Sequence, residues 1–322
     1  MSDEVIIWIT NPENYDPGMR AENKQIGAQR MDLFAAAGLP VRVVHASNLV
    51  AGWAQRPRLW CQDEDLLERP RGFMLSAWPW DAATGQHFRA ISRTIRASDS
   101  VLLNDGIRDP ESLGADKLAM SNHAAALGMP VLPAVAVPFG RYTRRVLPIV
   151  ERVLDCDTYI VKPREMATGF GVLKAQGQSQ LRACLDLLTP SGLGCFIQPY
   201  FANSGDLRVY VHRGQVLAGM LRRPAPDDYL ANLSVGGSAD AELVPAAIAA
   251  QSLELAASLD ADYLCVDWLV NEERGHVFNE WMTIVAAFED LPEPQRTTVA
   301  SALTKSIADR LAAAGVTTTS RP

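Results

Sequence analysis

Two acidic residues near the end of the chain lie in segments that otherwise have the composition of buried strands. Asp267 interrupts the apolar run 263–270, and Glu280 follows a second short apolar run at 276–278. An antiparallel hairpin over these runs would bring the two carboxylates side by side, where each is costly unless a cation offsets its charge. Two carboxylates with only oxygen ligands suit Mg2+ that arrives on the phosphates of a nucleotide. The alternative is that Asp267 merely caps a turn.

A glycine-containing loop forms the second candidate site. The run 159–163 predicts a strand ended by proline, the loop 164–171 contains Gly169-Phe170-Gly171, and the chain returns to strand at 172–174. Because no helix follows the loop, it is neither a P-loop nor a dinucleotide-binding crossover. Its backbone N–H groups could hold phosphate oxygens. A plain hairpin is the alternative reading of the same residues.

The first hundred residues predict a parallel sheet. Strands are expected over 5–10, 40–45, 72–77 and 101–104, with helices over 21–37 and 86–97 between them. This order of elements predicts right-handed crossovers. Ligands of open α/β sheets gather at the carboxyl ends of the strands. Candidates for a substrate mouth are therefore Asn11, Asn14, Trp78 and Asn104, although ordinary loop polarity explains each of them as well.

The rest of the chain mixes helices and strands without an internal repeat. Helices are predicted over 112–127, 143–154, 181–188, 245–259 and 294–314. Strands are predicted over 131–137, 195–201, 206–211 and 215–220, in addition to the hairpin at 263–278. The segment 206–220 alternates polar and apolar residues, which is typical of a hairpin with charges on one face.

Bulk composition narrows the class of protein. The length of 322 residues suggests two or three domains. The net charge of -7 argues against a nucleic-acid or anionic-membrane surface as the main partner. We expect no membrane span, because uninterrupted apolar runs are short, and no signal peptide, because two acids precede the first apolar run. Five scattered cysteines predict reduced thiols of a cytoplasmic protein.

Eight short motifs, in this order, resemble the ATP-grasp superfamily, and within it carboxylate–amine ligases similar to ribosomal-protein S6 glutamate ligase and glutathione synthetase. The resemblance covers roughly residues 100 to 290, and the first hundred residues fit the family's leading domain only loosely. No single motif is specific, but their order and spacing make coincidence improbable. The motifs are Asp116-Lys117-Leu118 with Gly128-Met129-Pro130, then 159–163, 169–172, 196–200, 206–209, Asn232-Leu233 with Gly236-Gly237, 266–268 and 278–280.

The resemblance implies an α/β protein with the ATP-grasp fold. A parallel α/β domain would occupy residues 1–110. Two α+β subdomains would then clasp ATP, a small lid over 111–195 and a C-terminal subdomain over 196–322 that carries the metal and substrate site.

The resemblance also implies a role for each matching residue. Lys117 and Lys162 would approach the α- and β-phosphates, Lys being a compact charge suited to that task. A solvated surface charge is the alternative for either lysine, and Lys162, between Val161 and Pro163, fits it poorly. The remaining assignments are Gly169, Phe170, Gly171 and Asp206 as cofactor-binding residues, Gln198, Pro199 and Tyr200 at the adenine slot, Arg208 near the γ-phosphate, Arg223 and Asn232 at the substrate end, and Asp267, Glu280 and Asn279 at Mg2+.

One motif departs from the family pattern. The last metal ligands usually form Glu-x-Asn, whereas this chain has Asn279-Glu280-Trp281-Met282. If Glu280 replaces the glutamate, Met282 stands at the asparagine position and cannot bind Mg2+. If Asn279 replaces it, Trp281 stands there instead. We expect Glu280 to be the ligand with Asn279 helping.

The implied reaction is the joining of a carboxylate to an amine with ATP and Mg2+, or Mn2+ in its place, through an acyl phosphate. Positioning and charge neutralisation would dominate catalysis, and no Ser/His/Asp arrangement indicates a hydrolase. The alternatives are a ligase with a thiol or hydroxyl acceptor and a nucleotide-binding regulator without turnover. Small carboxylates and amines, amino acids or a peptide among them, are the expected partners, and a homodimer stays open. Trp53, Trp78 and Trp80 hint at an aromatic or apolar substrate, but core packing explains them equally.

Overall fold

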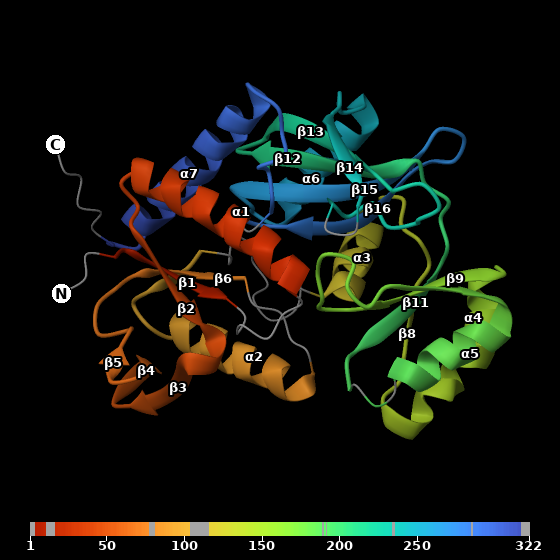
Figure 1. Ribbon diagram of the computed structural model, residues 1–322, viewed down its shortest axis with the longest axis horizontal. Helices are drawn as coiled ribbons and strands as arrows, with labels where there is room; N and C mark the ends of the chain where they lie inside the picture. The colour runs from red at the N-terminus through yellow and green to blue at the C-terminus, as the bar shows by residue number, and fades with distance from the viewer. Residues whose placement is uncertain are drawn as a thin grey trace.

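The structure is a computed structural model that describes residues 4–10, 17–76, 81–103, 116–188, 190, 192–233, 236–284 and 286–316. Within these ranges the strands form four sheets, and helices pack against each of them (Figure 1). The first sheet belongs to the N-terminal part of the chain, and the next two contribute the residues of the candidate site.

The N-terminal sheet is parallel and has the order β2-β1-β6-β7. Its strands are β1 (Ile6–Thr10), β2 (Val41–His45), β6 (Gly72–Leu75) and β7 (Val101–Leu102), and its helices are α1 (Pro17–Ala36) and α2 (Ala82–Arg96). The predicted parallel arrangement is confirmed. Helix α2 begins earlier than expected because Asp81 and Thr84 form a reciprocal capping box, with Asp81 Oδ1 accepting from the Thr84 N–H at 2.8 Å.

A small antiparallel sheet follows β2 and was not predicted. A short 3-10 helix (Ala46–Asn48) leads into β3 (Leu49–Ala54), β4 (Arg56–Cys61) and β5 (Glu64–Asp65). Asp65 holds the sheet together, because its carboxylate accepts from two backbone N–H groups and pairs with Arg58 at 2.7 Å. Trp53 lies on β3 with 74% of its surface exposed, so core packing does not account for it.

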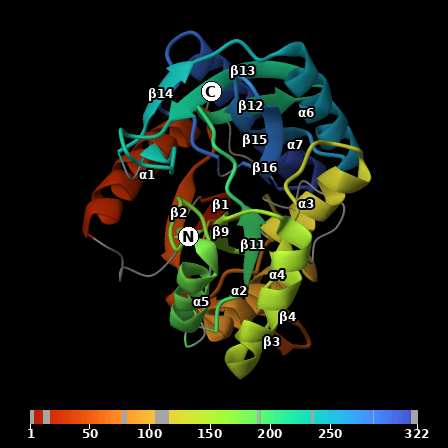
Figure 2. The same cartoon turned by 90° about the vertical axis from the view of Figure 1, so that its right-hand side faces the viewer.

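The second large sheet is antiparallel and has the order β10-β9-β11-β8; we call it the lid sheet. Its strands are β8 (Val135–Ala136), β9 (Thr158–Pro163), β10 (Leu173–Gln176) and β11 (Cys195–Pro199). Helices α4 (Leu147–Leu154) and α5 (Gly177–Leu188) pack against it around a separate apolar core (Figure 2). The predicted helix 143–154 is a 3-10 helix over Gly140–Val146 before it becomes α4.

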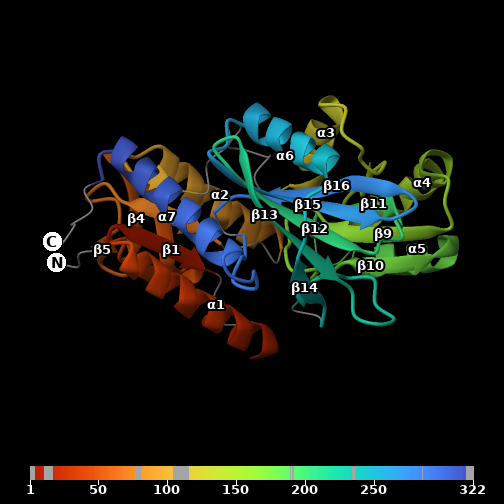
Figure 3. The same cartoon turned by 90° about the horizontal axis from the view of Figure 1, so that it is seen from above.

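The C-terminal sheet is antiparallel and has the order β14-β13-β12-β15-β16. Its strands are β12 (Gly205–His212), β13 (Gln215–Arg223), β14 (Ser238–Ala241), β15 (Tyr263–Asn271) and β16 (Gly275–Met282). Helices α3 (Lys117–Ala126) and α6 (Ala246–Ser258) cover one face, and α7 (Gln295–Ala313) packs on the other (Figure 3).

Helix α7 joins the C-terminal sheet to the N-terminal sheet. Its residues Leu303 and Leu311 belong to one apolar cluster that also contains Ile6 of β1 and Tyr210 of β12. The guanidinium of Arg310 donates to two backbone carbonyls at the end of β7, those of Leu102 and Leu103, with Nη2 at 3.1 Å from Leu102 O. These two sheets therefore share a core, whereas the lid sheet has its own.

The structure bears on three expectations about the whole chain. None of the helices in the described ranges is long and apolar enough to cross a bilayer. All five cysteines are free thiols, as expected, and burial raises the pKa of Cys195 to about 11. The predicted fold class, an α/β arrangement with a parallel N-terminal sheet, is confirmed.

Candidate active site

Two lysines from different elements reach the same part of β16. Lys162 lies near the end of β9, and its Nζ donates to Asn279 Oδ1 at 3.0 Å. Lys117 is the first residue of α3, and its Nζ lies 3.2 Å from Glu280 Oε2 and donates to Met166 O. Because β9 belongs to the lid sheet and β16 to the C-terminal sheet, the cluster lies where the two sheets meet (Figure 1).

Lys162 is held in a poorly solvated place. It is 9% exposed, and burial lowers its pKa to about 8; attraction to Glu280 opposes this shift, and repulsion from Lys117 adds to it. An ammonium group in such a site is incompletely compensated, so a further anion would stabilise its charged form. Two lysines with this geometry suit the oxygens of a nucleotide's phosphates.

A bulge in β16 brings two successive side chains to the lysines. Asp267 pairs with Glu280, whereas the next residue of β15 pairs with Phe278, so Asn279 is the extra residue. Phe278 and Trp281 both enter the apolar cluster on the opposite face of the sheet. Residues three apart cannot share a face in a regular strand, but they can across a bulge. The structure therefore brings both Asn279 and Glu280 to the lysines, rather than one of them.

Four charged residues form a buried network on the same sheet. Asp267 accepts from Arg208 Nε at 2.9 Å, from Arg208 Nη2 at 2.8 Å and from Arg222 Nη2 at 2.7 Å. Arg222 Nη2 also lies 2.9 Å from Asp206 Oδ2. The strand register sets these pairs, because Arg208 lies opposite Asp267 and Asp206 lies opposite Arg222. Each of the four residues is 7% exposed or less.

The pKa values of the two aspartates in this network are shifted in opposite directions. Burial disfavours the charged form of Asp267, but Arg208 and Arg222 more than offset it and hold the pKa of that carboxyl below its usual range. Burial raises the pKa of Asp206 to about 6, against the attraction of Arg222 and with the repulsion of Asp267. Only Asp267 receives bonds from both guanidinium groups, which accounts for the difference.

Arg222 belongs to this network but was not among the predicted residues, which included its neighbour Arg223 instead. Arg223 is the next residue of β13 and points away from the network, where it pairs with Asp240 at 2.8 Å and remains 43% exposed. Strand alternation was the available signal, because Arg222 shares a face with Met220 and with Asp206 across the hairpin.

The glycine loop between β9 and β10 packs against the segment that follows β13. Gly169 and Gly171 have φ of +78° and +73°, a region that favours glycine. A Cβ added to Gly169 would lie 2.7 Å from Asn232 Oδ1, so the loop backbone and Asn232 are in close contact. Tyr229 Oη also donates to Val172 O at 2.9 Å. The structure thus brings Gly169 and Asn232 together, with the side chain of Phe170 44% exposed.

The residues expected at an adenine slot lie at the end of β11. Gln198 is 5% exposed, and Pro199 is the last residue of the strand. The ring of Tyr200 lies under Lys174 Nζ, which is 3.8 Å from the ring centroid. From here the chain leaves the lid sheet for β12, so these residues occupy the connection between the two sheets.

The residues present fit a hard divalent cation in part. Within the described ranges, no three His, Cys, Asp or Glu side chains are grouped so that they could hold a metal. Mg2+ does not require such a group, because it keeps waters and binds substrate phosphates. Glu280 and Asn279 each present a side-chain oxygen on the lysine side, and Asp206 Oδ2 is 3.4 Å from Asn279 Nδ2. Asp267 differs, because guanidinium groups occupy both of its oxygens.

The residues expected at a substrate mouth, Asn11, Asn14, Trp78 and Asn104, lie outside the described residues, and so does Trp80.

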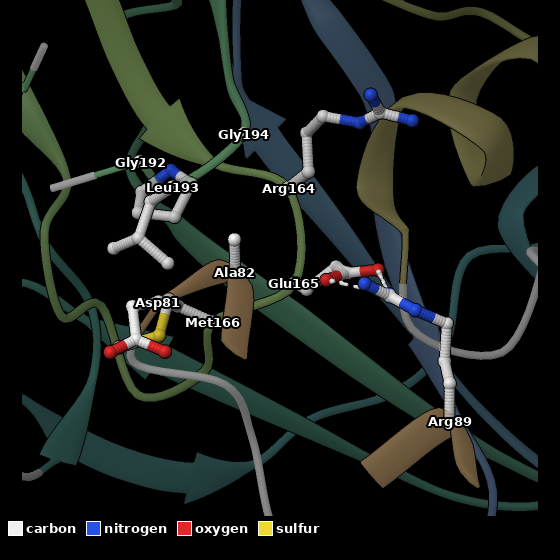
Figure 4. A pocket seen from close by; sticks show the side chains of 10 residues that line it. Asp81, Ala82, Arg89, Arg164, Glu165, Met166, Gly192, Leu193 and Gly194 are labelled. Atoms are coloured by element: carbon white, nitrogen blue, oxygen red, sulfur yellow. Dashed lines mark hydrogen bonds and ion pairs between the residues drawn. The ribbon is translucent and has the colours of Figure 1, made fainter. Parts of the chain in front are cut away.

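A cavity of about 300 Å³ lies beside the site, between α2 and the start of the glycine loop (Figure 4). Its wall includes Pro163, Arg164 and Met166, the residues that follow Lys162. Arg89 of α2 reaches across to Glu165, with 3.2 Å between Nη1 and Oε1. The cavity is therefore lined both by the N-terminal part of the molecule and by the loop whose Met166 carbonyl accepts from Lys117.

Comparison with solved structures defines the fold class as ATP-grasp. The D-cycloserine synthetase DcsG superimposes with a TM-score of 0.64 over 95% of this chain and 99% of that chain, at 14% identity. At this identity the likeness concerns the fold alone.

Comparison of sequences defines the family. The model of the RimK-like ATP-grasp domain matches residues 140–305, slightly more than half of the chain, and the chain belongs to this family. A probable alpha-L-glutamate ligase of Xylella fastidiosa is 36% identical over 85 residues, which are 26% of this chain and 28% of that protein. One of Aeromonas salmonicida is 25% identical over 191 residues, 58% of this chain and 61% of that protein. The chain thus matches less than two thirds of each relative's length. The resemblance to the ATP-grasp superfamily is confirmed.

Proposed function

We propose that this chain is an ATP- and Mg2+-dependent ligase that joins a carboxylate to an amine. One observation carries the proposal: Lys117 and Lys162 converge on Asn279 and Glu280 where the lid sheet meets the C-terminal sheet. Cations and oxygen ligands at one point suit a nucleotide with its metal. Membership of the RimK-like ATP-grasp family supports the same reading.

The proposed reaction has two steps. The substrate carboxylate attacks the γ-phosphorus of ATP and releases ADP, and the resulting acyl phosphate is attacked by an amine, which loses a proton as phosphate leaves. Lys117 and Lys162 would neutralise the α- and β-phosphates, and Arg208 would lie near the γ-phosphate and the acyl group. Catalysis of this kind depends on positioning and charge, and it requires no nucleophilic side chain.

Other residues would hold the nucleotide in place. The backbone of Gly169–Gly171 would contact phosphate oxygens, and Gln198, Pro199 and Tyr200 would line the adenine ring. Glu280 with Asn279 would hold Mg2+ or Mn2+, which when bound neutralises phosphate charge as the γ-phosphoryl group moves. Asn232, in contact with Gly169, would lie at the substrate end of the same site.

The substrates are proposed as small carboxylates and amines, with amino acids and peptides as the first classes to test. The relatives named alpha-L-glutamate ligase make glutamate the first compound to supply. Incubated with ATP, Mg2+ and a productive pair, the protein should form ADP, phosphate and amide in equal amounts. Hydroxylamine added with the carboxylate alone should trap the acyl phosphate as a hydroxamate. Tight ATP binding with no hydroxamate from a broad set of carboxylates would favour a nucleotide-binding regulator.

Nucleotide binding can be tested without knowing the substrates. ATP with Mg2+ should raise the melting temperature, as any ligand of the native state does. Lys162→Ala should remove most of that rise, because the ammonium group lies in the proposed phosphate site. Lys305→Ala is the matched control, since this lysine lies on α7 and pairs with Asp309 at the surface. Equal ATP-induced shifts in Lys162→Ala and the unmodified protein would contradict the role given to Lys162.

A further inference from the structure

Asp267 directs both of its side-chain oxygens at guanidinium groups. Its Oδ1 accepts from Arg208 Nε, and its Oδ2 accepts from both Arg208 Nη2 and Arg222 Nη2, at distances from 2.7 to 2.9 Å. The residue is fully buried. The bidentate contact with Arg208 follows from the backbone, because the two residues are direct partners in the ladder between β12 and β15. A cation on Asp267 would lie against two buried guanidinium groups or would have to displace one of them.

The four residues of the network balance each other in charge. Arg208 and Arg222 supply two positive charges, and Asp206 and Asp267 supply two carboxylates on the same sheet face. Arg222 Nε has no hydrogen-bond partner in the described structure, so this guanidinium depends on the two aspartates for compensation. Removing one member of a buried ion pair leaves an uncompensated charge, which is strongly destabilising. A metal that displaced either arginine would cause the same imbalance.

The surroundings of Glu280 and Asn279 suit the binding of a cation better than those of Asp267. The Glu280 side chain is 21% exposed, and it pairs with Lys117, a residue that can also face phosphate. The bulge places Asn279 and Glu280 next to each other on the lysine side of β16. Their oxygens can therefore meet a metal carried by a nucleotide without the loss of a buried ion pair.

We infer that Asp267 is a positioning residue that fixes Arg208 and Arg222, and that hard-cation ligation is left to Glu280 and Asn279. The metal half of this inference rests on the proposed function. The positioning half rests only on the buried network. Asp267 ties β12, β13 and β15 together through the two guanidinium groups, and Arg208 Nη1 extends the contact to Ala287 O at 3.4 Å. Arg208 is thereby held in one orientation before any substrate arrives.

The positioning half is tested by a double-mutant cycle on thermal stability without nucleotide. Asp267→Asn should lower the melting temperature by roughly 10 °C, because two buried arginines then face one carboxylate. Arg208→Gln should also lower it. The double variant Asp267→Asn/Arg208→Gln should recover much of the combined loss, since it leaves the neutral pair Arg222–Asp206 and a neutral Gln–Asn contact. A small effect of Asp267→Asn, or simple addition of the two losses, would overturn the positioning role.

The metal half is tested by titrating Mn2+ in the presence of saturating ADP and following free Mn2+ by electron paramagnetic resonance. Glu280→Gln should weaken Mn2+ binding by about tenfold or more while keeping the melting temperature. Asp267→Asn, measured below its melting transition, should keep the affinity of the unmodified protein, because it loses no metal ligand. If Asp267→Asn binds Mn2+ as weakly as Glu280→Gln, Asp267 is a ligand and the inference is wrong.

The metal half and the positioning half of the inference can be contradicted separately. If the unmodified protein binds no Mn2+–ADP, the proposed function and the metal half fall together. The stability cycle is measured without nucleotide, so it decides the positioning role of Asp267 in either case.

Discussion

Asp267 is the residue whose expected role the structure changes most. Its place opposite Glu280 could be predicted from the hairpin, and the register confirms it. Its partners could not be predicted, because Arg208 and Arg222 are 59 and 45 positions away along the chain and meet it only once β12, β13 and β15 are paired. That both Asn279 and Glu280 lie next to the lysines could not be predicted either, because this depends on a bulge that strand periodicity does not indicate.

The lowered pKa of Lys162 predicts proton uptake when ATP binds. In the unliganded protein burial lowers this pKa from 10.5 to about 8, so above that pH the group is increasingly neutral. Phosphate favours the charged form, so binding near pH 8.5 should draw a proton onto the protein, and affinity should fall as the pH rises further. Titration calorimetry in two buffers of different ionisation enthalpy measures this uptake.

The control for this titration is Lys162→Arg, whose guanidinium stays charged throughout that pH range. It should bind ATP without the uptake that Lys162 causes. In the absence of ATP, a rise in pH should have the opposite effect on folding stability. Because folding lowers the pKa of Lys162, the free energy of unfolding should increase as the pH rises from about 8 to 10.5. Equal proton uptake by both proteins would mean that another group titrates.

At the scale of elements, long periodic segments were predicted and short or polar ones were not. Apolar runs and caps indicated β1, β9, β12, β15, α6 and α7 to within a few residues. The β3–β4–β5 sheet was missed because β4 contains Arg56 and Arg58 and because the sheet is held by the interactions of Asp65, which no local pattern reveals. β14 was missed because it is a short, polar edge strand.

The glycine loop between β9 and β10 yields a prediction about one added methyl group. Gly169→Ala should weaken ATP binding, because the new Cβ would lie 2.7 Å from Asn232 Oδ1, so the loop or the Asn232 side chain must move. Gly177→Ala is the matched control: it has a similar positive φ of +68°, but nothing lies within 4 Å of its added Cβ. Both variants should lose about 1 kcal/mol of stability from the backbone conformation. Only Gly169→Ala should change the ATP dissociation constant, measured by calorimetry.

At the scale of the whole molecule, the N-terminal and C-terminal sheets share one apolar core and the lid sheet has another. The boundaries predicted at residues 110 and 195 stay a prediction, but the apolar cluster around α7 unites residues from both ends of the chain. Sequence periodicity identified α7 as a helix without indicating which sheets it joins. Long-range packing of this kind is decided by the shapes of both surfaces, and a local pattern contains only one of them.

Leu311 tests this shared core. It is fully buried on α7, and its Cδ2 would be 2.5 Å from a Cβ added to Gly72 of β6. Leu311→Ala should lower the free energy of unfolding by about 2–5 kcal/mol, as expected for a large-to-small change in a packed core. Leu187→Ala on α5 should have little effect, because Leu187 is 77% exposed. Urea titration measures both, and a loss in Leu311→Ala as small as that in Leu187→Ala would contradict a shared core.

The position of α7 also bears on how the chain acquires its fold during synthesis. The contact between Arg310 and the residue after β7 spans 207 positions. A ribosome translating at about 5–20 residues per second would leave the first sheet without this covering helix for roughly ten seconds or more. During that time the part of one apolar face that α7 covers would be open to water, to chaperones or to other nascent chains. We therefore expect fragments that stop before residue 295 to depend on chaperones, however complete their first sheet is.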